Sequence, residues 1–189
     1  CTGYHVHTAV LVGRLVERKG VDRMLEALAA LGDDLPPWRY LVVSDGPYRP
    51  QLEALSARLD LTDRVTFTGF VDAGQLPRLY SVSDVFAMPN REVSVSGEGS
   101  LSVEGFGIVF IEAAACGKPV IAGRSGGAVH AVDDGRTGLL VDGDDLESVQ
   151  AALLQLSDPE QRQRMGAAGI DFAAAFDWEA SAAILRRYL

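Results

Sequence analysis

Short apolar runs alternate with segments of helical periodicity along most of the chain. The runs are three to five residues long and rich in Val, Leu and Ile, which is typical of strands buried on both faces of a sheet. The strands expected on this basis are residues 8–12, 40–43, 65–67, 85–88, 119–122 and 138–141.

Amphipathic helices are expected between these runs, at 21–31, 50–59, 75–81, 109–116 and 146–156. Strands that alternate with helices predict an α/β fold, a Rossmann-like doubly wound parallel sheet of about six strands. The last third differs, because Asp158-Pro159 offers an N-cap followed by proline at the first helical position. A second start at Asp177-Trp178 completes a predicted set of C-terminal helices without a strand between them.

Length and composition favour one domain over residues 1–189. A chain of this length with 48% hydrophobic residues can bury one substantial core. No apolar run approaches the ~20 residues that cross a bilayer, and two cysteines give no disulfide framework. The chain is therefore expected to be soluble and cytoplasmic.

The formal charge of −9 argues against a nucleic-acid partner, which needs a basic face. It leaves room for a small phosphate ligand, because Arg14, Arg18, Lys19 and Arg23 gather in one short segment. A solvated helix start is the alternative interpretation of that segment taken alone.

Ligands of an open parallel sheet bind at the carboxyl ends of its strands. The first expected strand leads into Gly13-Arg14-Leu15-Val16-Glu17-Arg18-Lys19-Gly20, which is not the dinucleotide fingerprint G-x-G-x-x-G. A glycine that permits close approach, a forked guanidinium and a lysine five residues later make a candidate pyrophosphate clamp from Gly13, Arg14 and Lys19.

A second candidate segment contains Glu104 and Glu112, eight positions apart across a loop-to-helix junction. A fully helical segment, with its ~1.5 Å rise per residue, would separate them by about 12 Å, which suits two groups that hold opposite ends of an extended ligand. The helix start near Gly107 and Ile108 can accept an anion between them. A nucleoside diphosphate sugar has this shape; the alternative is a solvated Glu104 and a Glu112 on a helix surface.

The histidines His5, His7 and His130 lack metal-ligand spacing, so no metal site is expected. His130 follows the pair Gly126-Gly127, which is either a turn or a place where backbone meets sugar.

Taken together, these motifs resemble family 4 of the retaining glycosyltransferases, which have the two-domain GT-B architecture. The resemblance covers nearly the whole chain. It rests on the segments Val12-Gly13-Arg14-Leu15, Lys19-Gly20, Asp45-Gly46-Pro47, Gly69-Phe70-Val71, Glu104-Gly105-Phe106-Gly107, Glu112 to Ile121, Gly126-Gly127 and Thr137 to Val141.

The resemblance implies a role for each matching residue. Arg14 and Lys19 would bind the donor diphosphate and stabilise its growing charge, without a divalent metal or another cofactor. Glu104 and the backbone of Phe106, Gly107 and Ile108 would hold the transferred sugar. Glu112 would hold the ribose hydroxyls, while Phe70 and Val71 would lie against the nucleobase.

Within that family, the long segment from Pro89 to Glu104 is similar to the branch that makes phosphatidylinositol mannosides from GDP-mannose. A lipid or saccharide acceptor, and a location peripheral to the inner face of the membrane, would follow. Two residues depart from the family pattern. Ser44 replaces a usual glycine, which we expect to be tolerated, and His130 replaces a common glutamate, which puts sugar or acceptor contacts in doubt.

The resemblance also implies that the chain is the C-terminal, donor-binding half and that the N-terminal acceptor domain is absent from it. We therefore expect the isolated chain to need an acceptor domain or partner chain for turnover. A binding module without catalysis is the alternative, and a scaffold without a ligand would leave Arg14, Lys19, Glu104 and Glu112 unexplained.

Overall fold

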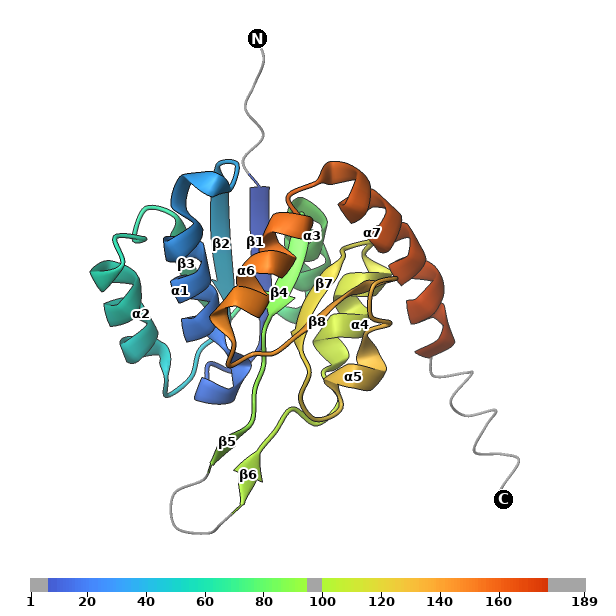
Figure 1. The fold of residues 1–189 in the computed structure, drawn as a ribbon. Helices are drawn as coiled ribbons and strands as arrows, with labels where there is room; N and C mark the ends of the chain where they lie inside the picture. Colours follow the sequence, from blue (N-terminus) through green and yellow to red (C-terminus); the bar gives the residue numbers. More distant parts are fainter. Residues whose placement is uncertain (1–6, 95–99, 177–189) are drawn as a thin grey trace.

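A computed structural model describes residues 7–94 and 100–176. Its main feature is a six-stranded parallel sheet in the order β3-β2-β1-β4-β7-β8 (Figure 1). The strands are β1 (His7–Val12), β2 (Trp38–Val43), β3 (Val65–Gly69), β4 (Val85–Met88), β7 (Val120–Gly123) and β8 (Gly138–Val141). All six expected strands are confirmed, each boundary within two residues of the prediction.

Seven α-helices lie between the strands or after the last strand in the described residues. They are α1 (Val21–Leu31), α2 (Arg49–Arg58), α3 (Leu76–Val82), α4 (Ile108–Ala115), α5 (Ala128–Ala131), α6 (Leu146–Gln155) and α7 (Pro159–Ala173). Short 3-10 turns are η1 (Glu17–Lys19), η2 (Gly32–Asp34), η3 (Ala73–Gln75) and η4 (Ala174–Phe176). The Asp158 side chain accepts from the Glu160 N–H, so the predicted cap of α7 is confirmed. The second start expected at Asp177 lies outside the described residues.

Helices cover the sheet and bury it. Helix α1 contacts α2 and α6, while α4 contacts α5 and α7; Figure 1 shows α1 and α6 on the near side of the strands. The core between the strands and α4 contains Phe86 and Phe110, whose rings meet edge to face with centroids 5.6 Å apart. No helix among the described residues is both long and apolar enough to cross a bilayer.

The strand order indicates where a ligand-binding crevice is expected in this type of sheet. Connections run to one side from β1 through β2 to β3, and then return to the other side of β1 with β4. A doubly wound sheet opens a crevice at this reversal, outside the carboxyl ends of the strands. The loops that follow β1 and β4 border it, and these two loops contain Lys19 and Glu104.

A small hairpin was not expected from the sequence. Strands β5 (Val93–Ser94) and β6 (Leu101–Ser102) pair antiparallel, and Figure 1 shows them projecting from the carboxyl edge of the sheet. Strands of two residues are too short to give a periodic signal.

Ser44 takes a strained backbone conformation. Its φ is 105°, in the region that favours glycine, while its N–H donates to the Gly69 carbonyl at 2.9 Å. Serine therefore fits at a position where the family that this sequence resembles usually has glycine. Its backbone is strained there, whereas that of glycine would not be.

Candidate functional site

The segment after β1 turns back on itself and places Lys19 inside the protein. Gly20 has a φ of 70°, and a Cβ on it would lie 1.9 Å from the Pro89 carbonyl oxygen. Only glycine fits there. The turn brings the Lys19 ammonium beside Gly13, where a Cβ would lie 3.5 Å from Nζ. Gly13 and Lys19 therefore share one corner of the crevice.

Lys19 and Glu104 form a buried ion pair across the crevice. Lys19 Nζ lies 2.7 Å from Glu104 Oε2, and their side chains are only 8% and 10% exposed. Arg18 Nε lies 4.0 Å from the same oxygen. Both cations therefore face Oε2, and no described residue donates to Glu104 Oε1. This arrangement excludes the solvated Glu104 that the sequence left open.

Helix α4 begins beside Glu104 through a glycine that cannot be replaced without strain. Gly107 has a φ of 78°, and a Cβ on it would lie 2.4 Å from the Phe110 ring. The first N–H groups of a helix lack acceptors within it and carry partial positive charge. The start of α4 is thus a potential anion site next to the Lys19–Glu104 pair.

The glycine pair Gly126-Gly127 packs against the Glu104 backbone. The Gly127 N–H donates to the Glu104 carbonyl at 3.0 Å, and a Cβ on Gly126 would lie 2.0 Å from that oxygen. The pair is therefore more than a turn, because it fixes the backbone of Glu104. His130 lies in the following helix α5 and is exposed.

Glu112 lies within α4 and contacts α3. The Tyr80 hydroxyl donates to Glu112 Oε2 at 2.8 Å. Burial of the phenol, helped by the bond to Glu112 and its charge, raises the pKa of Tyr80. Tyr80 therefore stays a donor at neutral pH and holds the Glu112 carboxylate in place.

The other residues predicted to contact the donor differ in how exposed their side chains are. Phe70 is 83% exposed just after β3, Val71 is half-buried, and Ile108 is exposed at the start of α4. The Phe106 ring packs on Phe176, with centroids 5.7 Å apart, so it turns towards the end of α7. Only the backbone of Phe106 stays at the predicted site.

Arg14 is exposed, and no described residue pairs with its guanidinium. The structure thus places Gly13 beside the Lys19 ammonium and pairs Lys19 with Glu104. Among the described residues, neither Arg14 nor Phe70 makes a hydrogen bond or an ion pair with Lys19 or Glu104.

Sequence reasoning missed three buried polar residues at or near the carboxyl edge. Asn90 and Arg91 directly follow β4, and Tyr80 holds Glu112. A charged residue immediately after a buried strand is a usable signal, because that position faces the crevice of a doubly wound sheet. Tyr80 gave no such signal, since a tyrosine in a short helix is ordinary core composition.

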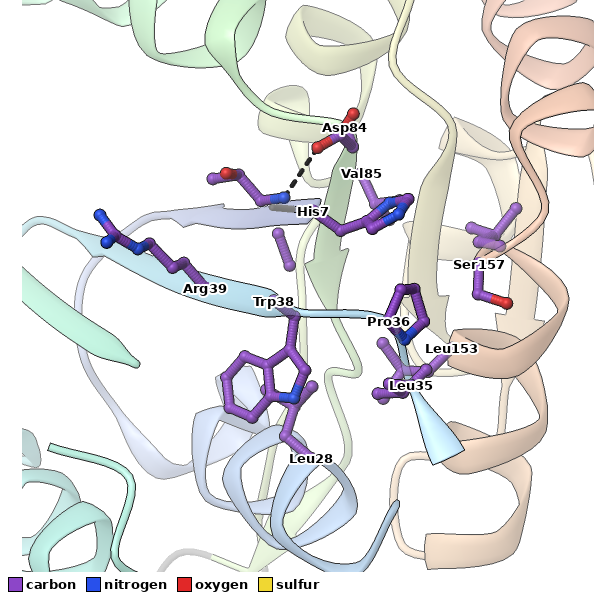
Figure 2. A pocket seen from close by; sticks show the side chains of 13 residues that line it. His7, Leu28, Leu35, Pro36, Trp38, Arg39, Asp84, Val85, Leu153 and Ser157 are labelled. Carbon is purple, nitrogen blue, oxygen red and sulfur yellow. Dashed lines mark hydrogen bonds between the residues drawn. The ribbon is translucent and has the colours of Figure 1, made fainter. Parts of the chain in front are cut away.

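A separate small cavity lies at the opposite edge of the sheet. Its volume is about 40 Å³, and Figure 2 shows its lining residues, among them Trp38, Leu28 and Leu153. The lining is largely apolar and comes from the starts of β1, β2 and β4. This cavity is too small and too apolar for a nucleotide sugar, so the crevice is the better candidate.

No metal centre is apparent in the part of the chain that the structure describes. Within 7–94 and 100–176, no three His, Cys, Asp or Glu side chains come together in a metal-binding group. Independence of a metal remains a prediction.

Comparisons with known proteins agree with this geometry. The family model for glycosyl transferases group 1 matches residues 6–172. A GDP-mannose-dependent alpha-(1-6)-phosphatidylinositol monomannoside mannosyltransferase of Mycolicibacterium smegmatis is 44% identical over 165 residues, covering 87% of this chain and 42% of the relative. The chain thus spans less than half the length of that curated relative.

Comparison with solved structures also finds glycosyltransferases. Sucrose-phosphate synthase from Thermosynechococcus elongatus is 34% identical with a TM-score of 0.81, over 97% of this chain and 44% of that chain. Anabaena HepE in complex with UDP and glucose is 26% identical with a TM-score of 0.81, over 97% of this chain and 48% of that chain. The chain belongs to the glycosyl transferases group 1 family, and its fold is one Rossmann-like half of a GT-B glycosyltransferase.

Proposed function

We propose that this chain is the donor-binding half of a retaining, metal-independent mannosyltransferase that uses GDP-mannose and transfers to a lipid or saccharide acceptor. The observation that carries the proposal is the buried Lys19–Glu104 pair, 2.7 Å apart, beside the start of α4. It combines a cation for phosphate, a carboxylate for sugar hydroxyls and free N–H groups in one crevice. The name of the relative from Mycolicibacterium smegmatis supports GDP-mannose as the donor.

Each residue has a role in this proposal. Lys19 and Arg14 bind the two phosphates and stabilise the negative charge that grows as the donor bond breaks. Glu104 accepts from a sugar hydroxyl through Oε1, while Oε2 stays with Lys19. Glu112 accepts from the ribose hydroxyls, held by Tyr80. The exposed Phe70 and its neighbour Val71 lie against the base.

The reaction follows from this placement. The bond between the sugar C1 and the β-phosphate oxygen breaks, and its electron pair leaves with the diphosphate. The acceptor hydroxyl oxygen bonds to C1 from the same face, and its proton passes to the departing phosphate oxygen. Lys19 and Arg14 stabilise the transition state because negative charge is building up on the leaving phosphate oxygen there, more than in the bound donor. Configuration at C1 is therefore retained.

The acceptor half must come from elsewhere in this proposal. The chain covers 42% of its mannosyltransferase relative, and a donor half alone does not position an acceptor hydroxyl. We propose that an acceptor-binding domain, in the same chain or a separate one, completes the site. Since that domain would bring the lipid, it would also place the protein at the inner face of the membrane.

The test is turnover with the acceptor half present. The full-length or reconstituted protein is given GDP-mannose, with and without a phosphatidylinositol mannoside acceptor, and GDP release is measured. We expect acceptor-dependent release, lost in Lys19→Ala, and an α-linked product by NMR. Tight GDP-mannose binding with no acceptor-dependent release would favour the non-catalytic binding module. A β-linked product would contradict retention.

A further inference from the structure

Arg91 is a buried arginine to which the proposed mechanism gives no task. It follows β4 directly after Pro89 and Asn90, and its side chain is only 7% exposed. A guanidinium removed from water must be paired, and a buried pair is sensitive to the loss of either partner. The residues that contact Arg91 therefore indicate which segments of the chain it holds in place.

Three acidic side chains face Arg91: Glu17 and Asp22 from the segment around η1, and Asp144 from the loop before α6. Its Nη1 and Nη2 form a forked contact with Asp22, at 2.8 and 2.7 Å from Oδ1 and Oδ2. Nη2 lies 3.5 Å from Glu17, and Nε lies 3.3 Å from Asp144. Burial acts to lower the pKa of Arg91, but the hydrogen bonds and charges of these carboxylates outweigh it and raise the pKa. The cation is therefore permanent.

The acidic partners flank the segment that carries Lys19. Glu17 lies within η1, and Asp22 lies in the first turn of α1, so they lie on either side of Lys19. The Arg91 N–H donates to the Arg18 carbonyl at 2.8 Å, which adds a backbone link at the same point. Arg91 thus binds this segment through both its backbone and its side chain.

On its opposite side the segment contacts Asp45 and Tyr48, and the Tyr48 hydroxyl also donates to Asp22 Oδ2 at 3.5 Å. The Leu15 N–H donates to the Asp45 carbonyl at 2.9 Å, and the Leu15 carbonyl accepts from the Tyr48 N–H at 3.1 Å. These contacts fix residue 15, ahead of η1. Nearer to Lys19, the backbone contact comes from Arg91, which donates to the Arg18 carbonyl, while the Lys19 side chain bonds Glu104.

The neighbouring Asn90 extends the same support to Glu104. Its Oδ1 accepts from the Gly123 N–H at 2.9 Å, and its Nδ2 donates to the Ser125 carbonyl at 3.2 Å. The loop so held continues to Gly127, whose N–H donates to Glu104. Arg91 therefore contacts the segment that carries Lys19, and Asn90 reaches Glu104 indirectly, through the loop that ends at Gly127.

We propose that Arg91 is a positioning residue for diphosphate binding, which acts by holding Asp22 and the Arg18 carbonyl so that Lys19 faces the crevice. The proposal rests on the proposed donor site. It assigns Arg91 no contact with the ligand, so its loss weakens contacts to the phosphates and leaves contacts to the nucleoside unchanged.

Two measurements on the chain as it exists test this. The first is hydrogen–deuterium exchange without ligand, which reports local opening. In Asp22→Asn, Arg91→Lys and Arg91→Met, we expect the amides of residues 18–24 to exchange at least ~10-fold faster, because local opening becomes less costly. The matched control is Arg136→Met, which removes an exposed arginine paired with Asp133 and leaves exchange at 18–24 unchanged. If Arg91→Met fails to fold, the milder Arg91→Lys and Asp22→Asn decide.

The second measurement is calorimetric titration with GDP and with guanosine. Displacing a charged group by about 1 Å can cost up to ~100-fold, so we expect GDP affinity to fall ~10- to 100-fold in the Arg91 and Asp22 variants. Guanosine affinity should change less than about twofold, which a general loss of structure would not allow.

The outcomes separate the two proposals. Unchanged exchange at 18–24, or equal losses for GDP and guanosine, would overturn the role of Arg91. Faster exchange in a chain whose wild type binds neither probe would support the contact by which Arg91 holds residues 18–24, and would contradict both the donor site and a role in diphosphate binding.

Discussion

At the residue scale, Lys19 and Glu104 are each almost fully removed from water, and each is the nearest charged partner of the other. Removing one partner of a buried pair leaves an unpaired charge and costs about 3 kcal/mol or more. We expect Lys19→Met to lower the free energy of unfolding by about 3 kcal/mol in urea denaturation. The double variant Lys19→Met/Glu104→Gln should recover most of that loss, because the cation left there, Arg18, has a side chain that is 30% exposed to water. A double variant with the summed cost of the single changes would contradict this coupling.

Replacing Ser44 with glycine is expected to raise the free energy of unfolding, not to lower it. Its φ of 105° strains the backbone, which costs about 1–3 kcal/mol, whereas glycine adds an entropy cost of about 0.5–1 kcal/mol on folding. Ser44→Gly should therefore stabilise the chain by about 1 kcal/mol in thermal or urea unfolding. Destabilisation would mean that the serine side chain contributes more than its backbone costs.

Single residues differed in how well the sequence revealed them. Gly13, Lys19 and Glu104 stand in motifs with a recognisable order, and the structure brings them together. Arg91 and Tyr80 act through partners distant in sequence, at Asp22 and Glu112. Such pairings depend on the folded arrangement, so spacing along the chain does not encode them.

At the element scale, the start of α4 depends on one glycine. A Cβ on Gly107 would meet the Phe110 ring at 2.4 Å with a φ of 78°. We expect Gly107→Ala to cost about 2–4 kcal/mol from backbone strain and overpacking, measured by thermal unfolding. Gly105→Ala is the control, because nothing lies within 4 Å of its added Cβ, and it should change stability by less than about 0.5 kcal/mol. Equal effects of the two changes would refute this explanation.

Element prediction succeeded where hydrophobic periodicity was strong. The six buried strands, the five helices expected at 21–31, 50–59, 75–81, 109–116 and 146–156, and the helix expected after Asp158 are all present. The β5–β6 hairpin and the four-residue helix α5 were missed, since elements this short bury too little surface to impose a pattern. The hairpin borders the crevice, so the missed part is near the candidate site.

At the scale of the whole molecule, alkaline pH should destabilise the fold. Burial, helped by the charge of Asp22, raises the pKa of Tyr40, and burial with the bond to Glu112 raises that of Tyr80. In the unfolded chain both phenols lose their protons near pH 10, whereas in the folded chain they keep them. The unfolded state therefore binds fewer protons above about pH 10, and stability falls as pH rises.

Each such tyrosine contributes a slope that approaches about 1.4 kcal/mol per pH unit above pH 10. Tyr80→Phe should remove one of these contributions from urea unfolding measured between about pH 9 and 11. It should also cost about 1 kcal/mol at pH 7, through the lost bond to Glu112. An unchanged slope would mean that Tyr80 titrates normally in the folded chain.

The strand order explains why residues from distant segments meet in one crevice. The reversal between β1 and β4 brings the loops that contain Lys19 and Glu104 to the same edge. The alternation of strands and helices predicted this architecture, because it requires a parallel sheet with both faces covered. It did not predict which base or sugar is bound, since the alternation of strands and helices carries no information about those groups.

The most direct test is calorimetric titration of this chain with GDP, UDP and ADP, repeated on Glu112→Ala. The account predicts that GDP binds preferentially and that the substitution weakens binding about 10-fold or more, through loss of charge-assisted hydrogen bonds to the ribose. Binding of all three with equal affinity, unaffected by Glu112→Ala, would contradict the assigned donor site.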